Sequence, residues 1–97
     1  MNNFNLSGYV GFAKRIPTKT ERSMAVYSIS IGPDEWVRLY SFGAHADYVI
    51  RNLRKGTLVE VSGKVRVNNG EIELISTTAQ VIRQSAVKPE EQPRSAA

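Results

Sequence analysis

Large aromatic side chains and a cation recur at every second position of one short segment. The segment Trp36-Val37-Arg38-Leu39-Tyr40-Ser41-Phe42 has the alternation of a β-strand, in which successive side chains point to opposite faces. Val and Leu fit a protein core, whereas an arginine buried without a partner would cost several kcal/mol. The sequence therefore predicts that the solvent-facing side of this strand carries Trp36, Arg38, Tyr40 and Phe42.

Exposed aromatic rings at this spacing are suited to stacking on other flat π systems. Unpaired nucleic-acid bases present such faces, and each stacked base contributes about 1–3 kcal/mol. Arg38 could pair with a phosphate or stack on a base. In the alternative interpretation, the aromatic rings pack in a core or an interface while the Arg38 guanidinium extends outward.

Basic residues are distributed so that they could line the same surface. They lie in a predicted loop over residues 13–23 and on the outward face of a predicted strand over residues 59–67: Lys14, Arg15, Lys19, Arg22, Lys64 and Arg66. A groove that follows the phosphates of a strand needs such cations, and they would make binding sensitive to salt. The alternative is a charged, solvated surface with no ligand.

The net charge of +4 and the pI near 9.7 also favour a polyanionic partner, although a charge of this size also serves solubility alone. The excess lies within residues 1–83, because basic and acidic residues balance in residues 84–97. We expect residues 1–83 to form one domain. The segment 84–97, rich in Pro, Glu, Gln, Ser and Ala, is expected to be a flexible tail.

The elements that must position these side chains are mainly strands. Alternation predicts a first strand with Phe4, Leu6, Gly8, Val10 and Phe12 at alternate positions, and strands over residues 24–31, 35–42, 59–67 and 71–83. In the second strand, one face is expected to carry Ala25, Tyr27, Ile29 and Ile31. Between Gly43 and Gly56, the apolar spacing of Ala46, Val49, Ile50 and Leu53 predicts a helix of about ten residues, with Gly56 at its C′ position.

Two local signals refine the last two strands. Asn68-Asn69-Gly70 predicts a tight hairpin turn, because Asn and Gly tolerate positive φ. The apolar positions of the last strand change parity, which predicts a bulge near Thr77-Thr78. The order β-β-β-α-β-β is that of an all-β, five-stranded OB-fold barrel with one helix between strands 3 and 4.

The residues for catalysis are missing. The chain has no cysteine, which excludes thiolate metal sites and thiol catalysis, and His45 is its single histidine, expected on the surface. No Gly-rich phosphate loop is present. We therefore expect no enzyme activity, no cofactor and no metal. No apolar run is long enough to cross a membrane and no signal peptide is recognisable, so we expect a cytoplasmic protein without membrane contact.

Several motifs together resemble the bacterial single-stranded DNA-binding protein family over about residues 4–82. The motifs are Leu6-x-Gly8-x-Val10, Met24-Ala25-x-Tyr27-x-Ile29, Glu35-Trp36-x-Arg38-x-x-x-Phe42-Gly43 and Leu53-Arg54-Lys55-Gly56-x-x-Val59-x-Val61-x-Gly63. The resemblance implies an OB fold that wraps single-stranded DNA without sequence preference. It also implies that Trp36 and Phe42 stack on bases, that Arg38 is a basic position of the same site, and that the chain forms homotetramers or homodimers.

The chain departs from the family pattern at three places. The Gly32-Pro33-Asp34 turn after the second predicted strand is short and lacks a further aromatic residue. The Asn68-Asn69-Gly70 hairpin is short where the family often has a long basic arm, and the tail lacks the acidic Pro-Phe tip that recruits repair proteins. We therefore expect single-stranded DNA binding in replication, recombination or conjugation, without recruitment through the tail. The alternatives are a primosomal-type or adaptor OB protein that uses the same face for protein contacts, and RNA binding by a cold-shock-like barrel.

Overall fold

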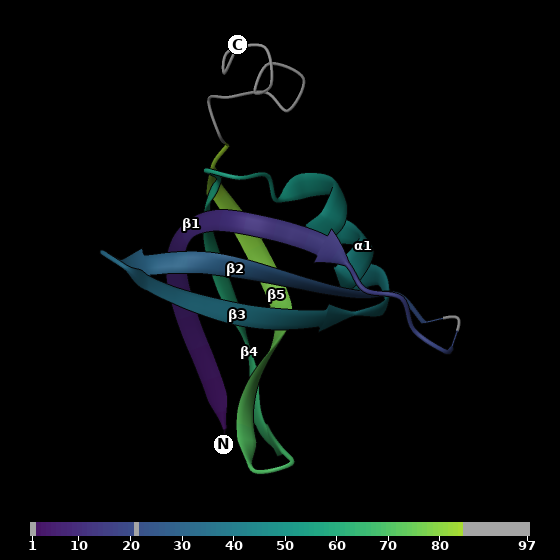
Figure 1. Ribbon diagram of the computed structural model, residues 1–97. Coiled ribbons are helices and arrows are strands. Elements are labelled where there is room, and N and C mark those ends of the chain that lie inside the picture. Colours follow the sequence, from purple (N-terminus) through teal and green to yellow (C-terminus); the bar gives the residue numbers. More distant parts are fainter. Residues whose placement is uncertain (1, 21, 85–97) are drawn as a thin grey trace.

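The computed structural model describes residues 2–20 and 22–84 (Figure 1). The elements follow the predicted order: β1 (Asn3–Arg15), β2 (Met24–Gly32), β3 (Glu35–Phe42), α1 (Gly43–Asn52), β4 (Leu58–Asn68) and β5 (Glu71–Arg83). The strands form a closed barrel in the spatial order β1-β2-β3-β5-β4. The predicted five-stranded barrel with one helix between β3 and β4 is confirmed.

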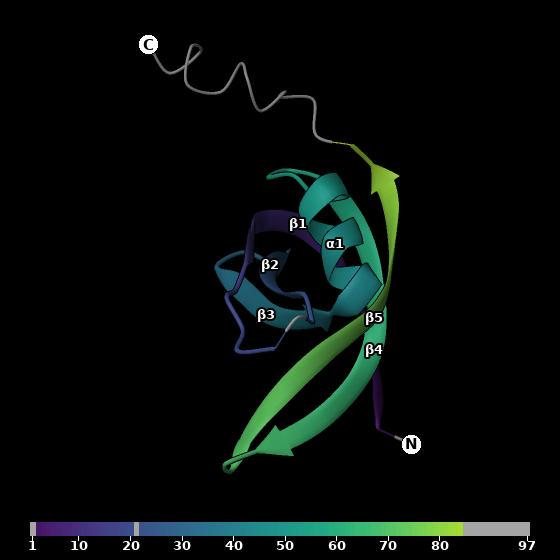
Figure 2. The same cartoon turned by 90° about the vertical axis from the view of Figure 1, so that its right-hand side faces the viewer.

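Strand β1 closes the barrel because it is long enough to pair with two neighbours. Its first half, Asn3 to Tyr9, pairs with β4, and its second half, from Tyr9 to Arg15, pairs with β2. On the other side, β3 meets β5 through one parallel pair, Tyr40 with Ile75. Helix α1 packs against one end of the barrel (Figure 2).

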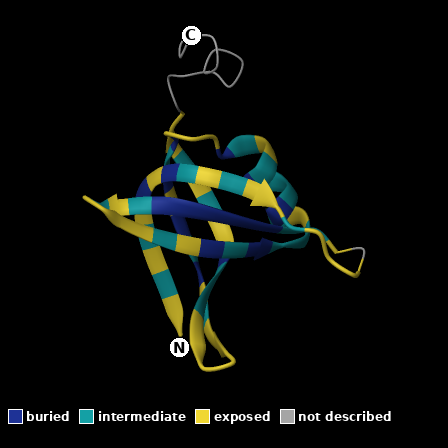
Figure 3. Cartoon of the chain, viewed as in Figure 1, coloured by how far each residue is buried: buried dark blue, intermediate teal, exposed yellow. Residues whose placement is uncertain are grey.

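The core lies between the inward faces of the strands and α1. Its fully or nearly fully buried members are Val10, Tyr27, Ile29, Leu39, Val49, Leu53, Val59 and Val61. Figure 3 shows that β2 is the most continuously buried strand, whereas the β4–β5 hairpin beyond the barrel is exposed. Gly63 permits close strand packing, because a Cβ there would overlap the backbone carbonyl of Ile75.

The two local predictions for β4 and β5 are confirmed. Asn69 and Gly70 have φ values of 53° and 80°, as the tight hairpin turn requires. The register shifts by one residue where Ser62 pairs with Thr78 but Gly63 pairs with Ser76, which leaves Thr77 as the extra residue of a bulge.

The first loop begins later than predicted. Residues 13–15 belong to β1, so Lys14 and Arg15 lie on a strand and pair with Val26 and Ala25 of β2. The hydrogen bonds of the β1–β2 ladder extend the strand beyond its alternating segment, and the Ile16 N–H donates to the Met24 carbonyl. Backbone pairing has overridden a local pattern that lacks apolar alternation.

Two bulges reverse predicted side-chain directions. The β1–β2 register shifts between Val10 and Phe12, so Gly11 is the extra residue and Phe12 turns outward. A second shift, between Ser30 and Gly32, leaves Ile31 exposed instead of on the core face of β2. The prediction for Ile31 and the continuous alternation assumed for β1 are therefore wrong.

The helix has the predicted length but a different C-terminal end. Helix α1 ends at Asn52, and Leu53 is its C-cap residue. Gly56 lies in the next turn, where its φ is 88°, and is therefore not the C′ residue. Of the predicted tail, all but Gln84 lies outside the described residues. No helix in the described part of the chain is long and apolar enough to cross a membrane.

Candidate nucleic-acid interface

The outer surface of β1, β2 and β3 gathers most of the predicted aromatic residues. Paired residues in an antiparallel sheet lie on the same face, and three cross-strand rows define this one. The rows run from β1 through β2 to β3: Tyr9, Ser30 and Trp36; then Phe12, Ser28 and Arg38; then Lys14, Val26 and Tyr40. We call this surface, together with Phe42, the aromatic face.

Strand β3 turns its predicted side toward solvent. Trp36 is 59% exposed and Arg38 is exposed, whereas Leu39 and Ser41 are buried. Tyr40 and Phe42 are half-buried. The alternation of the sequence therefore gives the correct orientation of β3, and the binding role of its side chains stays a prediction.

The central strand β2 contributes only small or buried side chains to this face. Ser28 and Val26 are almost fully covered, and Ser30 is half-buried. The larger side chains of β1 and β3 stand on either side of them. The surface of the aromatic face is therefore recessed along β2, between the larger side chains of β1 and β3.

The Trp36 indole extends from β3 across the recessed strand β2 toward β1. It lies over Gly11, since a Cβ at that position would overlap the indole ring. Beside it is a depression of about 440 Å³, lined by Gly11, Phe12, Ser28, Trp36, Val37, Arg38 and Lys55. A second depression, on another side of Trp36, includes Tyr9, Ile31 and Asp34. An exposed indole between two hollows is accessible to a flat ligand.

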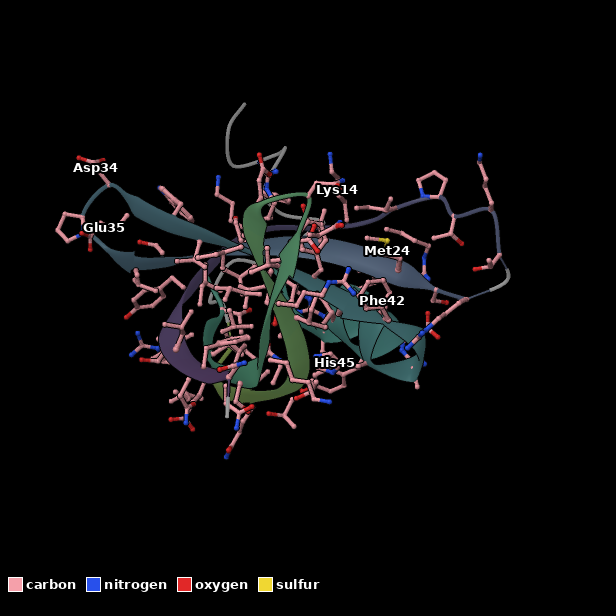
Figure 4. All side chains as sticks on the ribbon, turned by 90° about the horizontal axis from the view of Figure 1, so that it is seen from below. Lys14, Met24, Asp34, Glu35, Phe42 and His45 are labelled. Carbon is pink, nitrogen blue, oxygen red and sulfur yellow. The ribbon has the colours of Figure 1, made fainter. Side chains whose placement is uncertain are left out.

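Two guanidinium groups converge on Phe42. Arg22 lies 5.2 Å and Arg66 lies 5.9 Å from the centre of the Phe42 ring, within the range of cation–π contact. Arg22 comes from the loop after β1, and Arg66 from β4, where it also pairs with Glu73 at 2.9 Å. Figure 4 shows Phe42 near Met24, away from Asp34 and Glu35 at the other end of the β2–β3 pair. The predicted cations Arg22 and Arg66 are thus brought together at one end of the aromatic face.

The other predicted cations are placed differently. Lys14 lies on the aromatic face, with its amino group 6.0 Å from the centre of the Phe12 ring. Ile75 of β5 pairs with Tyr40 of β3 on one side and with Lys64 of β4 on the other, so Lys64 extends the cross-strand row of Tyr40. Lys19 is exposed in the loop, and no contact of its side chain with the aromatic face is seen.

Arg15 lies on the face opposite to Lys14 and pairs with Asp47 of α1 at 2.9 Å. This hydrogen bond is the main reason why the pKa of Asp47 is lowered from its usual value. The structure therefore does not bring Arg15 to the aromatic face.

His45 is half-buried at the end of a hydrogen-bond chain, and not fully exposed as predicted. The Tyr27 hydroxyl donates to Ser76 Oγ at 2.5 Å, and Ser76 Oγ lies 2.8 Å from His45 Nε2. Burial raises the pKa of Tyr27 to about 12 and lowers the pKa of His45 from 6.5. The chain links β2, β5 and α1, and its Tyr27 and Ser76 members are buried and inaccessible to a ligand, so we assign it a structural role.

Sequence reasoning missed Phe12 and Lys55 as members of the candidate interface. Phe12 fits the apolar alternation of the first predicted strand, and Lys55 lies just beyond the predicted helix, so neither was predicted to be a site residue. The available signal was Gly11, because a glycine inside a strand often marks a bulge that redirects the next side chain. Lys55 reaches Gly11 because Gly56 N–H donates to the Val10 carbonyl at 2.8 Å.

The fold matches solved structures of single-stranded DNA-binding proteins. The SSB domain of a protein from Synechococcus sp. gives a TM-score of 0.67 at 22% identity, covering 82% of this chain and 94% of that one. The mitochondrial single-stranded DNA-binding protein Rim1 from S. cerevisiae gives 0.71 at 19% identity, covering 86% and 97%. The protein PriB from Ralstonia solanacearum gives 0.67 at 13% identity, covering 86% and 99%.

These similarities are of structure. No protein-family model matches the chain, and no curated protein sequence matches it. Identities of this size establish the fold alone. The chain therefore has the OB fold found in the domains of single-stranded DNA-binding proteins.

Proposed function

We propose that this chain binds single-stranded DNA without sequence preference, in a stoichiometric and non-catalytic role. The observation that carries the proposal is the exposed Trp36 indole on a sheet face that it shares with Arg38. Contiguous exposed apolar patches commonly mark contact surfaces, and Trp36 shares its face with exposed Tyr9 and Phe12. Unpaired bases are flat partners for such rings. The fold similarity to single-stranded DNA-binding proteins supports the same function.

The cations complete the proposed mechanism. Arg22 and Arg66 approach the same Phe42 ring, and a phosphate there would be attracted by both guanidinium groups, although Arg66 is already paired with Glu73. A base that stacked on Phe42 would meet a ring already in contact with guanidinium groups. We therefore propose that Phe42 acts mainly as a platform for two phosphate-binding arginines, while the base-stacking role belongs to Trp36.

Trp36 is the single tryptophan of the chain, so its fluorescence reports on the interface alone. Titration with oligo-dT should quench this fluorescence, and the affinity should fall as salt is added. A Trp36→Ala variant, followed by electrophoretic or anisotropy assay with labelled DNA, should bind about 1–3 kcal/mol more weakly if the ring stacks on a base. Absence of binding by the wild-type chain at low salt would remove the proposal.

The proposal also specifies the type of nucleic acid, DNA, and a role in the cell. Protection of single strands in replication, recombination, repair or conjugation in the cytoplasm is the role that such binding would serve. Titration with matched DNA and RNA oligomers distinguishes DNA from RNA binding, because the 2′-OH is the main difference between the two strands. Tighter binding of the RNA oligomer than of the DNA oligomer would mean that the ligand is RNA and not DNA.

A protein-contact role is favoured by one separate observation. On the β4–β5 hairpin, the cross-strand pair Val67 and Ile72 is 68% and 72% exposed. Exposed apolar pairs of this kind often contact another protein, and a homodimer or homotetramer would also cover them. Light scattering without nucleic acid measures the mass of the assembly. An adaptor role would be supported by a salt-insensitive complex with another protein that forms without DNA.

A further inference from the structure

The bulge at Gly11 shapes one of the two depressions beside Trp36 on the aromatic face. The extra residue turns Phe12 outward, so that its side chain is 41% exposed and lines the depression beside Trp36. The Phe12 backbone N–H donates to Ser28 Oγ at 3.3 Å, which ties the bulge to the floor of this depression. The bulge therefore brings a second aromatic ring to the position where Trp36 crosses the sheet.

The size and lining of this depression suit one nucleobase. Its volume of about 440 Å³ lies within the range of about 300–1,000 Å³ that is common for small-ligand sites. The rings of Phe12 and Trp36 supply apolar, π-bearing surface, and Ser28 supplies a hydroxyl. A planar heterocycle in contact with both rings would exclude more water than one stacked on Trp36 alone.

The charges around the depression indicate where the phosphate would lie. Arg38 and Lys55 line it, and no acidic residue does. Lys55 is held in place by the adjoining backbone, where Val10 N–H donates to the Thr57 carbonyl at 2.9 Å and Gly56 N–H donates to the Val10 carbonyl at 2.8 Å. The second depression beside Trp36 includes Asp34, whose carboxylate would repel a phosphate.

We infer that the depression between Phe12 and Trp36 is a subsite for one unpaired nucleobase, whose adjacent phosphate is bound by Arg38 and Lys55. This inference rests on the proposed function. It assigns Phe12 a direct contact with the base. It also assigns Lys55, which lies outside the aromatic face, a contact with the backbone of the strand.

The test compares Phe12→Leu with Phe12→Tyr in the full chain. Leucine keeps apolar volume but removes the ring, whereas tyrosine keeps the ring. Each variant and the wild type are titrated with oligo-dT and with an abasic oligonucleotide of the same length, which has the phosphates but no bases. Phe12→Leu should weaken oligo-dT binding about 5- to 150-fold, the range that corresponds to loss of one stacked base. Binding of the abasic strand should not change, and Phe12→Tyr, which keeps the ring, should bind oligo-dT more tightly than Phe12→Leu.

The outcomes separate this inference from the proposed function. If the wild type fails to bind oligo-dT, the proposed function is wrong and the subsite falls with it. If the wild type binds oligo-dT but Phe12→Leu binds it equally well, the subsite is wrong and the function stands. Equal weakening of oligo-dT and abasic binding would also overturn the subsite, because a contact with the base cannot change binding of a strand that has none. Thermal unfolding of each variant checks that the barrel is intact.

Discussion

Replacement of Arg22 and Arg66 by glutamine should lower the salt dependence of DNA binding. Both guanidinium groups lie within 6 Å of the Phe42 ring centre and come from elements far apart in the sequence. On a single strand, each neutralised phosphate contributes about 0.7 to the slope of log affinity against log salt, so the double variant should lose about 1.4 from this slope. Over a fourfold rise in salt, a slope difference of about 1.4 amounts to about a sevenfold difference in affinity.

The measurement is oligo-dT binding followed by Trp36 fluorescence at several salt concentrations. The barrel should remain folded, because Arg66 and Glu73 form an exposed ion pair, and such pairs contribute at most about 1 kcal/mol. Each single variant should lose about 0.7 of the slope. Arg51→Gln is the matched control, because it removes one exposed positive charge from α1, outside the aromatic face.

Two results would refute this reasoning. An unchanged slope in the double variant would mean that neither arginine contacts a phosphate. A loss of slope in Arg51→Gln equal to that of each single variant, Arg22→Gln or Arg66→Gln, would mean that only the net charge matters. The convergence of the two arginines on Phe42 would then have no role in binding.

Three further predictions concern Gly11, which lies under the Trp36 ring, and the hydrogen-bonded residues Ser76 and His45. Gly11→Ala should displace the overlying Trp36 ring and weaken oligo-dT binding by up to about 1–3 kcal/mol, the value of one stacked base, in the same titration. Ser76→Ala removes the hydrogen-bond partner of the fully buried Tyr27 hydroxyl and should lower the free energy of unfolding in urea by about 1–3 kcal/mol. Since burial lowers the pKa of His45, the unfolded state binds more protons, and unfolding free energy should fall as pH drops from about 6.5 toward the lower folded-state pKa. His45→Gln should flatten this part of a stability–pH profile, whereas an unchanged profile would assign the loss to another group.

The architecture was predictable because independent local signals agreed. The alternating strands, the period of the helix and the Asn69-Gly70 turn all indicate the same order of elements. Even the bulge at Thr77 was readable, because apolar residues lie on both sides of it and their parity changes. A change of parity reveals a bulge only where side chains of known preference flank it.

The bulges at Gly11 and Ile31 were missed for the same physical reason. Phe12 is apolar and fits the core parity of β1, so the alternation does not show that it faces solvent, and only the neighbouring Gly11 marks the bulge. Ile31 likewise continues the alternation of β2 until the register shift. The direction of His45 could not be predicted either, because its partner Ser76 lies 31 residues away in the sequence. Contacts of this kind depend on how the barrel closes, which local patterns do not encode.

The Gly11 bulge links the stability of the barrel to the chemistry of its surface. Without the extra residue, the alternation from Val10 would turn Lys14 inward and Ala13 outward. A buried, unpaired lysine would cost several kcal/mol, whereas the observed register packs Ala13 against the core and leaves Lys14 exposed. The same shift turns Phe12 outward beside Trp36 and leaves no Cβ under the indole. The residue that allows β1 to pair correctly with β2 is therefore also the residue that forms the proposed base-binding hollow. For this reason a substitution at Gly11 should affect binding more than folding, provided that it preserves the bulge.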